Sequence, residues 1–342
     1  MFDRFRGAVV PLTIVSLLGA LWVSSDSLGA TSPVSALSTA RVLKTSGEPS
    51  GIAIDGQSGR AFITDPKDNT LFVFDPQSGD PLAFIPTGRQ PSQVVLSGAR
   101  AFVSNFADAS ITLADTATNS VVKTLAVGGL GLAVNNQTKR LYAAGGSRIS
   151  VLDTESAALV ATIEAPVGAS IWGLAVDPAT NRIYATDIAA PRVLVYDGAK
   201  NTLIGEVTLD APARFAIAAG PLGRVYIASF TDRSPQLSVI DGLSLKVIAR
   251  VPTSAFARSV VVDASGLAYI SAGTDGSVTA VDIGSRSSTK VSLADPAGAV
   301  SSSPAGSAVA INPASGALVV VTSGGGAPPA RPFGAPSPVA KP

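Results

Sequence analysis

The feature that most constrains this chain is a unit of about forty residues that recurs along most of its length. Each unit contains a short strand-like string with an aromatic residue at its centre. These aromatics follow one another at spacings of 40, 40, 42, 42 and 43 residues and are Phe62, Phe102, Tyr142, Tyr184, Tyr226 and Tyr269. Such a period indicates a repeat architecture, in which each unit buries its apolar surface against its neighbours.

Each unit predicts four short strands. A Gly-Leu-Ala-Val-Asp string, as at 173–177, begins a unit, and strings like those at 182–186, 193–197 and 246–250 supply its other strands. Gly, Pro, Asn, Asp and Ser separate the strings, as expected of tight turns. Several strings are apolar on both faces, as at 71–74, which favours sheets sandwiched between neighbouring sheets. The pattern therefore predicts a β-propeller with four-stranded blades.

The two ends of the repeat region complement each other. Residues 308–311 and 318–322 match the first two strands of a unit, and 41–45 match a fourth strand. We therefore predict an all-β, seven-bladed β-propeller of four-stranded blades, closed by an N-terminal strand in the last blade. The third strand of that blade would align near 31–35, where Pro33 makes a poor strand, so the blade has either three or four strands.

The N-terminus predicts an export signal, because Arg4 and Arg6 precede an apolar run over 8–23 that small and polar residues follow. Cleavage after Ala30 or Ala36 would leave a periplasmic or secreted protein without stable membrane insertion; an uncleaved anchor is the alternative. The predicted domains are thus a signal peptide over 1–36, the propeller over 37–323 and a flexible Gly/Pro-rich tail over 324–342.

Two residue types that carry much of enzyme chemistry are absent. The chain has no histidine and no cysteine, which excludes Ser-His-Asp and Cys-His catalysis, thiolate metal sites and the usual ligation of haem or iron–sulfur clusters. The charge is nearly balanced, with 25 basic and 24 acidic residues. A chain with so weak a net field is a poor candidate for binding single-stranded nucleic acid.

Three strings resemble a known repeat. They read Arg-Ala-Phe-Ile-Thr-Asp at 60–65, Arg-Ala-Phe-Val-Ser-Asn at 100–105 and Ser-Val-Ile-Asp at 238–241. They are similar to the Val-Tyr-Val-Thr-Asn strand and the later Val-Ile-Asp of the YVTN-type β-propeller repeat family, and the resemblance covers about residues 41–322. It implies an exported bacterial or archaeal propeller. It implies little about activity, because family members include surface-layer-like proteins, a periplasmic protein linked to single-stranded DNA and relatives of dehydrogenase subunits.

One aspartate ends the third strand of every unit; the set is Asp75, Asp115, Asp153, Asp197, Asp241 and Asp282. Because there is one copy per blade, these carboxylates are too far apart to form a catalytic or metal set. We expect each to accept backbone N–H bonds in the turn that follows it. The arginines two residues before the aromatics should lie on the same face and pair with these aspartates as scaffold.

The loops on the opposite face differ between units, so function is expected there. We predict a non-catalytic propeller that acts as a ligand-binding or protein-interaction scaffold, without a resident cofactor. A small anionic or planar ligand, or a partner protein, would be held by Arg89, Arg214, Arg258, Trp172, Phe106 and Phe230. The alternative is a metal-dependent, lactonase-like hydrolase whose Ca²⁺ or Mg²⁺ is bound by the oxygen ligands Glu48, Asp65, Asn105 and Asp187.

Overall fold

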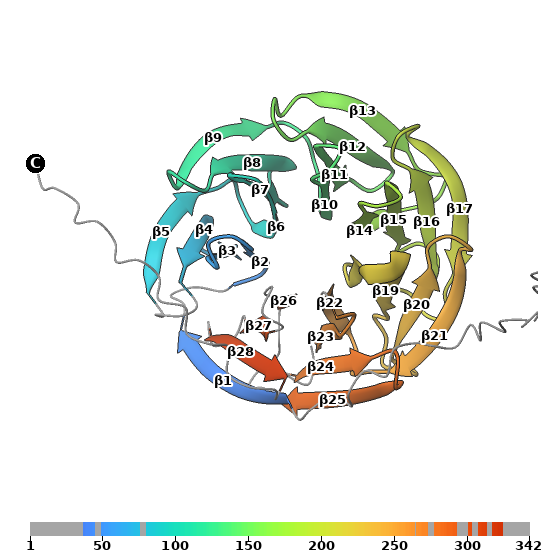
Figure 1. Ribbon diagram of the computed structural model, residues 1–342. Coiled ribbons are helices and arrows are strands. Elements are labelled where there is room, and N and C mark those ends of the chain that lie inside the picture. The colour runs from blue at the N-terminus through green and yellow to red at the C-terminus, as the bar shows by residue number, and fades with distance from the viewer. Residues whose placement is uncertain are drawn as a thin grey trace, which may run out of the picture.

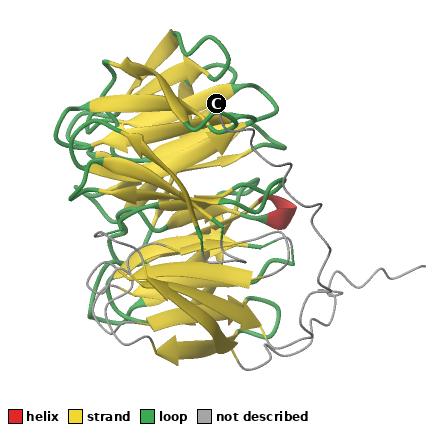
Figure 2. Ribbon diagram, turned by 90° about the vertical axis from the view of Figure 1, so that its left-hand side faces the viewer, coloured by secondary structure: helices red, strands yellow, loops and turns green. Residues whose placement is uncertain are grey.

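The computed structural model describes residues 37–44, 49–75, 80–263, 265–272, 277–292, 300–302, 307–312 and 317–323. The predicted export signal, the predicted tail and Glu48 lie outside these residues. The described chain is built almost entirely from β-strands, with one short 3-10 helix at Pro221–Gly223 (Figure 2). No helix in these ranges is long and apolar enough to cross a membrane.

Six four-stranded antiparallel sheets form blades around a central axis, each built from four consecutive strands (Figure 1). The innermost strands are β2 (Ile52–Ile54), β6 (Pro91–Ser97), β10 (Leu132–Asn135), β14 (Ile171–Asp177), β18 (Ile217–Ala219) and β22 (Ala257–Val262). The second strands are β3 (Ala61–Asp65), β7 (Arg100–Asn105), β11 (Arg140–Ala144), β15 (Arg182–Asp187), β19 (Arg224–Ala228) and β23 (Ala268–Ala272). The third strands are β4 (Thr70–Phe74), β8 (Ser110–Asp115), β12 (Arg148–Asp153), β16 (Arg192–Asp197), β20 (Gln236–Asp241) and β24 (Ser277–Asp282). The outermost strands are β5 (Pro81–Pro86), β9 (Ser120–Leu125), β13 (Leu159–Glu164), β17 (Thr202–Thr208), β21 (Lys246–Pro252) and β25 (Ser287–Ser292).

The ends of the described chain form a further four-stranded sheet, in the order β1 (Leu37–Lys44), β28 (Ala317–Ser323), β27 (Ser307–Asn312) and β26 (Val300–Ser302). In this terminal sheet β1 pairs antiparallel with β28, and β26 contacts both β22 and β2. Residues 308–311 and 318–322 therefore lie in its second and third strands, not in its first and second as predicted. The first strand was missed because it is a three-residue, serine-rich stretch without the Gly-Leu-Ala-Val string.

The predicted seven-bladed ring with an N-terminal closing strand is corrected accordingly. The structure has six complete blades of consecutive strands, β2–β25, whose side-chain packing is described throughout their strands except in the last two residues of β25. The terminal sheet is described at its backbone alone, and two of its strands, at 308–311 and 318–322, lie one position further from the axis than predicted.

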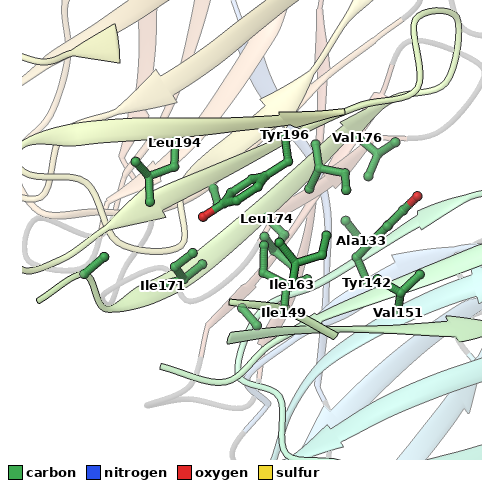
Figure 3. Close-up of a cluster of buried hydrophobic side chains, with 14 residues drawn as sticks. Ala133, Tyr142, Ile149, Val151, Ile163, Ile171, Leu174, Val176, Leu194 and Tyr196 are labelled. Carbon is green, nitrogen blue, oxygen red and sulfur yellow. The ribbon is translucent and has the colours of Figure 1, made fainter. Parts of the chain in front are cut away.

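The apolar core lies between neighbouring blades. Between the third and fourth blades, Tyr142 and Ile149 of one blade pack with Leu174 and Tyr196 of the next (Figure 3). The aromatic that marks each unit is buried in such a layer in all six blades. This arrangement explains why the strands are apolar on both faces, because each blade is covered on both sides by its neighbours.

The aspartates that end the third strands hold the following turns, as predicted. The Oδ1 atom of Asp153 accepts backbone N–H bonds from Glu155 at 3.1 Å and from Ser156 at 2.8 Å. The same kind of bond occurs at Asp115, Asp197, Asp241 and Asp282. The turn after Asp75 lies outside the described residues.

The arginines follow the prediction in part. Arg140 forms an ion pair with the aspartate of its own blade, with 2.6 Å between Nη1 and Asp153 Oδ2. Arg100 and Arg182 instead donate to backbone carbonyl oxygens of the next blade, at Thr154 and Gly242 respectively. These two arginines therefore link neighbouring blades, which the expected pairing within one blade did not anticipate.

Candidate ligand-binding site at the channel entrance

The six innermost strands place one equivalent residue each at the loop end of the central channel. The strand register fixes the equivalence, because Ile52, Val94, Leu132, Leu174, Ile217 and Val260 each pair with the residue after the aromatic of the second strand. We call the residue two positions before each of these six residues an entrance position. The six entrance positions are Ser50, Ser92, Leu130, Trp172, Phe215 and Arg258. All six side chains are half-buried or exposed.

The entrance positions differ in a way that the scaffold does not explain. The fourth, fifth and sixth blades carry Trp172, Phe215 and Arg258, whereas the first and second blades carry serines. The blades have the same strand order and the same register, so packing requirements are similar at every copy. Large aromatic and cationic side chains on three successive blades therefore favour a ligand contact at this side of the entrance.

An arginine and four aromatic rings gather at these three blades. The Cζ atom of Arg214 lies 4.1 Å from the ring centroid of Phe230 and 5.5 Å from that of Trp172. The Trp172 and Phe215 rings are 5.2 Å apart at an interplanar angle of 32°, and Phe230 meets Phe256 edge-on at 5.3 Å. We call Trp172, Arg214, Phe215, Phe230 and Phe256 the entrance cluster.

Arg214 has no anionic partner in the part of the chain whose side chains are described. Its guanidinium group makes no ion pair or hydrogen bond there, and the side chain is exposed. The two rings beside it provide cation–π attraction, which is worth about 0.5–1 kcal/mol at exposed sites. The side chain is thus positioned by aromatic contacts while its N–H donors remain open to a ligand.

A buried hydroxyl positions the backbone of the entrance cluster. Thr186 is fully buried, and its Oγ1 accepts the backbone N–H of Gly173 at 2.9 Å and donates to the carbonyl oxygen of Arg214. A Cβ atom at Gly173 would collide with that same carbonyl oxygen and would lie 2.8 Å from Thr186 Oγ1. The absence of a side chain at Gly173 is therefore what allows the fourth and fifth blades to approach closely here.

The structure brings together three of the six predicted ligand-binding residues, namely Trp172, Arg214 and Phe230. Arg258 occupies the entrance position of the next blade and has no ion pair within the described ranges. Phe106 is exposed over 57% of its surface, and no ring contact is found for it among the described side chains. These two residues remain candidates by position alone.

Arg89 is already neutralised. Its Nε lies 2.6 Å from Asp108 Oδ1, and its backbone N–H donates to the other oxygen of the same carboxylate at 2.6 Å. These backbone and side-chain hydrogen bonds hold the pKa of Asp108 below its usual value. Arg89 is therefore a weaker candidate for a free cation than Arg214.

Phe215 and Phe256 belong to the cluster but were not assigned to the ligand set. Phe215 could have been predicted from the sequence, because an alignment of the units puts it at the same position as Trp172. Phe256 could not have been, because its contact with Phe230 joins the loops of two different blades.

The metal ligands of the alternative hypothesis are engaged separately in their own blades. Asp65 accepts the backbone N–H of Lys67, and Asn105 donates to Ser110 and Thr112. Asp187 accepts the backbone N–H of Ser170 and the Nε–H of Arg192, both at 2.9 Å. Across the described side chains, no group of three or more acidic residues is arranged to hold a metal ion. Asp65 and Asp187 are thus not part of such an acidic group, and Glu48 lies outside the described residues.

Comparison with known proteins bears on the fold. No family model and no curated protein matches the sequence. Among solved structures, a chain of hydrazine synthase from Kuenenia stuttgartiensis is similar, with 16% identity and a TM-score of 0.73 over 82% of this chain and 97% of that chain. Raptor from Chaetomium thermophilum is similar with 13% identity and a TM-score of 0.73, over 84% of this chain and 29% of that chain. At such identities the likeness concerns fold alone, and with the six described blades it shows that the protein is a β-propeller.

Proposed function

We propose that the protein is an exported, non-catalytic β-propeller that binds a small anionic or planar ligand at the entrance cluster. The observation that carries this proposal is the placement of Trp172, Phe215 and Arg258 on three successive blades, with the guanidinium of Arg214 over the rings of Trp172 and Phe230. The likeness to other propellers supports a binding scaffold, and the predicted signal over 1–36 supports export.

Binding rather than catalysis fits the side chains available near the entrance. Histidine and cysteine, the usual bases and nucleophiles, are absent from the chain. Two carboxylates of this face already form ion pairs, Asp187 with Arg192 and Asp108 with Arg89. The groups near the entrance that could contact a ligand include the guanidinium of Arg214, the exposed Arg258 and Asp232, and the aromatic rings.

The cluster is also preorganised for an anion. An arginine that is already packed on aromatic rings loses less conformational entropy on binding than a free surface arginine does. A ligand carboxylate or phosphate would then form charge-assisted hydrogen bonds with donors that make none within the described ranges. A planar ligand group would gain further contact with Phe215, which is 40% exposed.

Native mass spectrometry of the mature protein, purified from its own cell envelope, tests this proposal. We expect a stoichiometric bound molecule on the wild type, and we expect the Arg214→Ala variant to lose it. The control is Arg148→Ala, since Arg148 is an exposed arginine at the start of β12 with no ion pair in the described chain. Equal occupancy of both variants would overturn the assignment of the site. A partner protein that leaves with Arg214→Ala would replace the small ligand by a protein interaction.

A further inference from the structure

We infer that the ligand of the entrance cluster is an aromatic carboxylate, in which a carboxylate group lies within a bond or two of a planar ring. This inference rests on the proposed function and narrows it to one chemical class. It combines two observations: a guanidinium with open donors and an exposed aromatic ring on the next residue, Phe215.

The guanidinium favours an anion that presents two oxygens side by side. Phe230 and Trp172 cover the carbon centre of Arg214, so the donors available to a ligand are the N–H groups at the edge of the guanidinium. These donors form a fixed fork that matches the two oxygens of a carboxylate.

The entrance cluster offers fewer hydrogen-bond donors than a typical phosphate site. Phosphate sites commonly use several free backbone N–H groups in one loop. Here the backbone N–H of Phe230 already donates to Pro212 and that of Phe256 donates to Thr231. A carboxylate needs none of these groups, so it suits the entrance cluster better.

The neighbouring surface favours a ring next to that carboxylate. Phe215 is 40% exposed although it packs against Trp172, and it also lines the central cavity of about 270 Å³. A planar ring stacked on Phe215 would gain about 0.5–1.5 kcal/mol beyond its area burial, according to measured aromatic pairs.

Two sources could supply this chemistry, a free aromatic acid and the carboxyl end of a peptide that finishes in an aromatic residue. The fluorescence of Trp172 can report the binding of either the free acid or the peptide. The chain has two tryptophans, and the other one, Trp22, lies in the predicted signal peptide, so the mature protein carries Trp172 alone. Its fluorescence should change when a ligand reaches the entrance cluster, and Trp172→Phe supplies the blank.

The test is a fluorescence titration with matched probes. Benzoate carries both features, benzamide keeps the ring without the charge, and acetate keeps the carboxylate without the ring. The peptide arm compares acetyl-Gly-Phe as the free acid with its amide. We expect saturable binding of benzoate or of the peptide acid, at least about tenfold tighter than binding of benzamide, acetate or the peptide amide.

Variants of the protein complete the test. Arg214→Lys keeps the charge but removes the fork, so it should weaken benzoate binding about tenfold or more, whereas Arg148→Ala should not change it. Equal affinity for benzoate and acetate, or for benzoate and benzamide, would overturn the inference, and so would a lack of binding up to about 10 mM of every probe. The proposed function would still stand in those cases if a different copurifying molecule is lost from Arg214→Ala in native mass spectrometry.

Discussion

The guanidinium carbon of Arg214 lies 4.1 Å from the ring centroid of Phe230, although the two residues belong to loops on either side of β18 and β19. The antiparallel turn between these strands returns the chain to the entrance, which brings the arginine and the ring together. Replacing Phe230 by Leu should therefore leave Arg214 less ordered. We expect ligand affinity to fall about two- to fivefold, in line with a lost cation–π contact of about 0.5–1 kcal/mol.

The control for that change is Phe84→Leu, at an exposed ring on the outermost strand β5. Both variants are compared by the Trp172 titration. If Phe84→Leu weakens binding as much as Phe230→Leu does, the contact between Phe230 and Arg214 does not determine the affinity.

Thr186→Val tests the buried hydroxyl under Arg214. Valine has nearly the same shape but leaves the backbone N–H of Gly173 and the carbonyl oxygen of Arg214 without their partner. We expect a loss of about 1–3 kcal/mol in the free energy of unfolding, measured by chemical denaturation. Thr162→Val, at an exposed position of β13, should change it by less than about 0.5 kcal/mol. Comparable losses at the two sites would contradict the role given to Thr186.

Gly173→Ala tests the close approach of the fourth and fifth blades. The added Cβ would meet the carbonyl oxygen of Arg214 and would lie 3.1 Å from Ile217 Cγ2, so β14 or β18 must shift. We expect destabilisation of about 1–3 kcal/mol, as for overpacked cores, together with weaker ligand binding.

Gly128→Ala is its matched control. The nearest atom to a Cβ at Gly128 is Ala109 Cβ at 3.5 Å, which is an ordinary contact. This variant should therefore unfold at nearly the same denaturant concentration as the wild type. A Gly173→Ala protein as stable as Gly128→Ala would show that the blades do not approach as described.

The turn aspartates predict a dependence of stability on pH. The backbone N–H of Ser156, its hydroxyl and further hydrogen bonds, including that of Arg140, lower the pKa of Asp153 to about 2. A carboxyl group with a lowered pKa contributes stability above its unfolded pKa, and this contribution is lost as the pH falls towards the folded value. We expect the difference in unfolding free energy between the wild type and Asp153→Asn to be constant above about pH 5 and to shrink towards pH 2.

Denaturant titrations of both proteins between about pH 2 and pH 6 measure this difference. Asp232→Asn is the control, because Asp232 is exposed and its carboxylate makes no hydrogen bond or ion pair in the described chain. A gap between the wild type and Asp153→Asn that does not change with pH would contradict the prediction.

The blades could be predicted from the sequence because similar residues occupy the same packing positions in every unit. Every unit buries its central aromatic between blades, and the units with described turns use an aspartate to hold the turn after the third strand. The recurring strings therefore predicted four strands per blade. The terminal sheet was misread because its innermost strand, Val300–Ser302, carries no apolar string to align. The apolar strings at 308–311 and 318–322 were therefore assigned to the first and second strands of the sheet, whereas they form the second and third.

The site was readable only in part. Trp172, Arg214 and Phe230 stood out because the loops on that face vary between units. The ion pair of Arg89 could not be predicted, because its partner Asp108 lies 19 residues further along the chain and becomes a neighbour through the turn of the second blade. Phe256 escaped notice because ring contacts between loops of different blades depend on the angle at which the blades meet.

The most direct test of the binding claim is a crystal structure of the mature protein purified from its own cells, with the copurifying molecule bound. The account predicts that this molecule contacts Arg214, Trp172 and Phe215 at the channel entrance, with its charged group on the guanidinium. A molecule bound at the opposite face or along the outermost strands, with the entrance cluster left free, would contradict it.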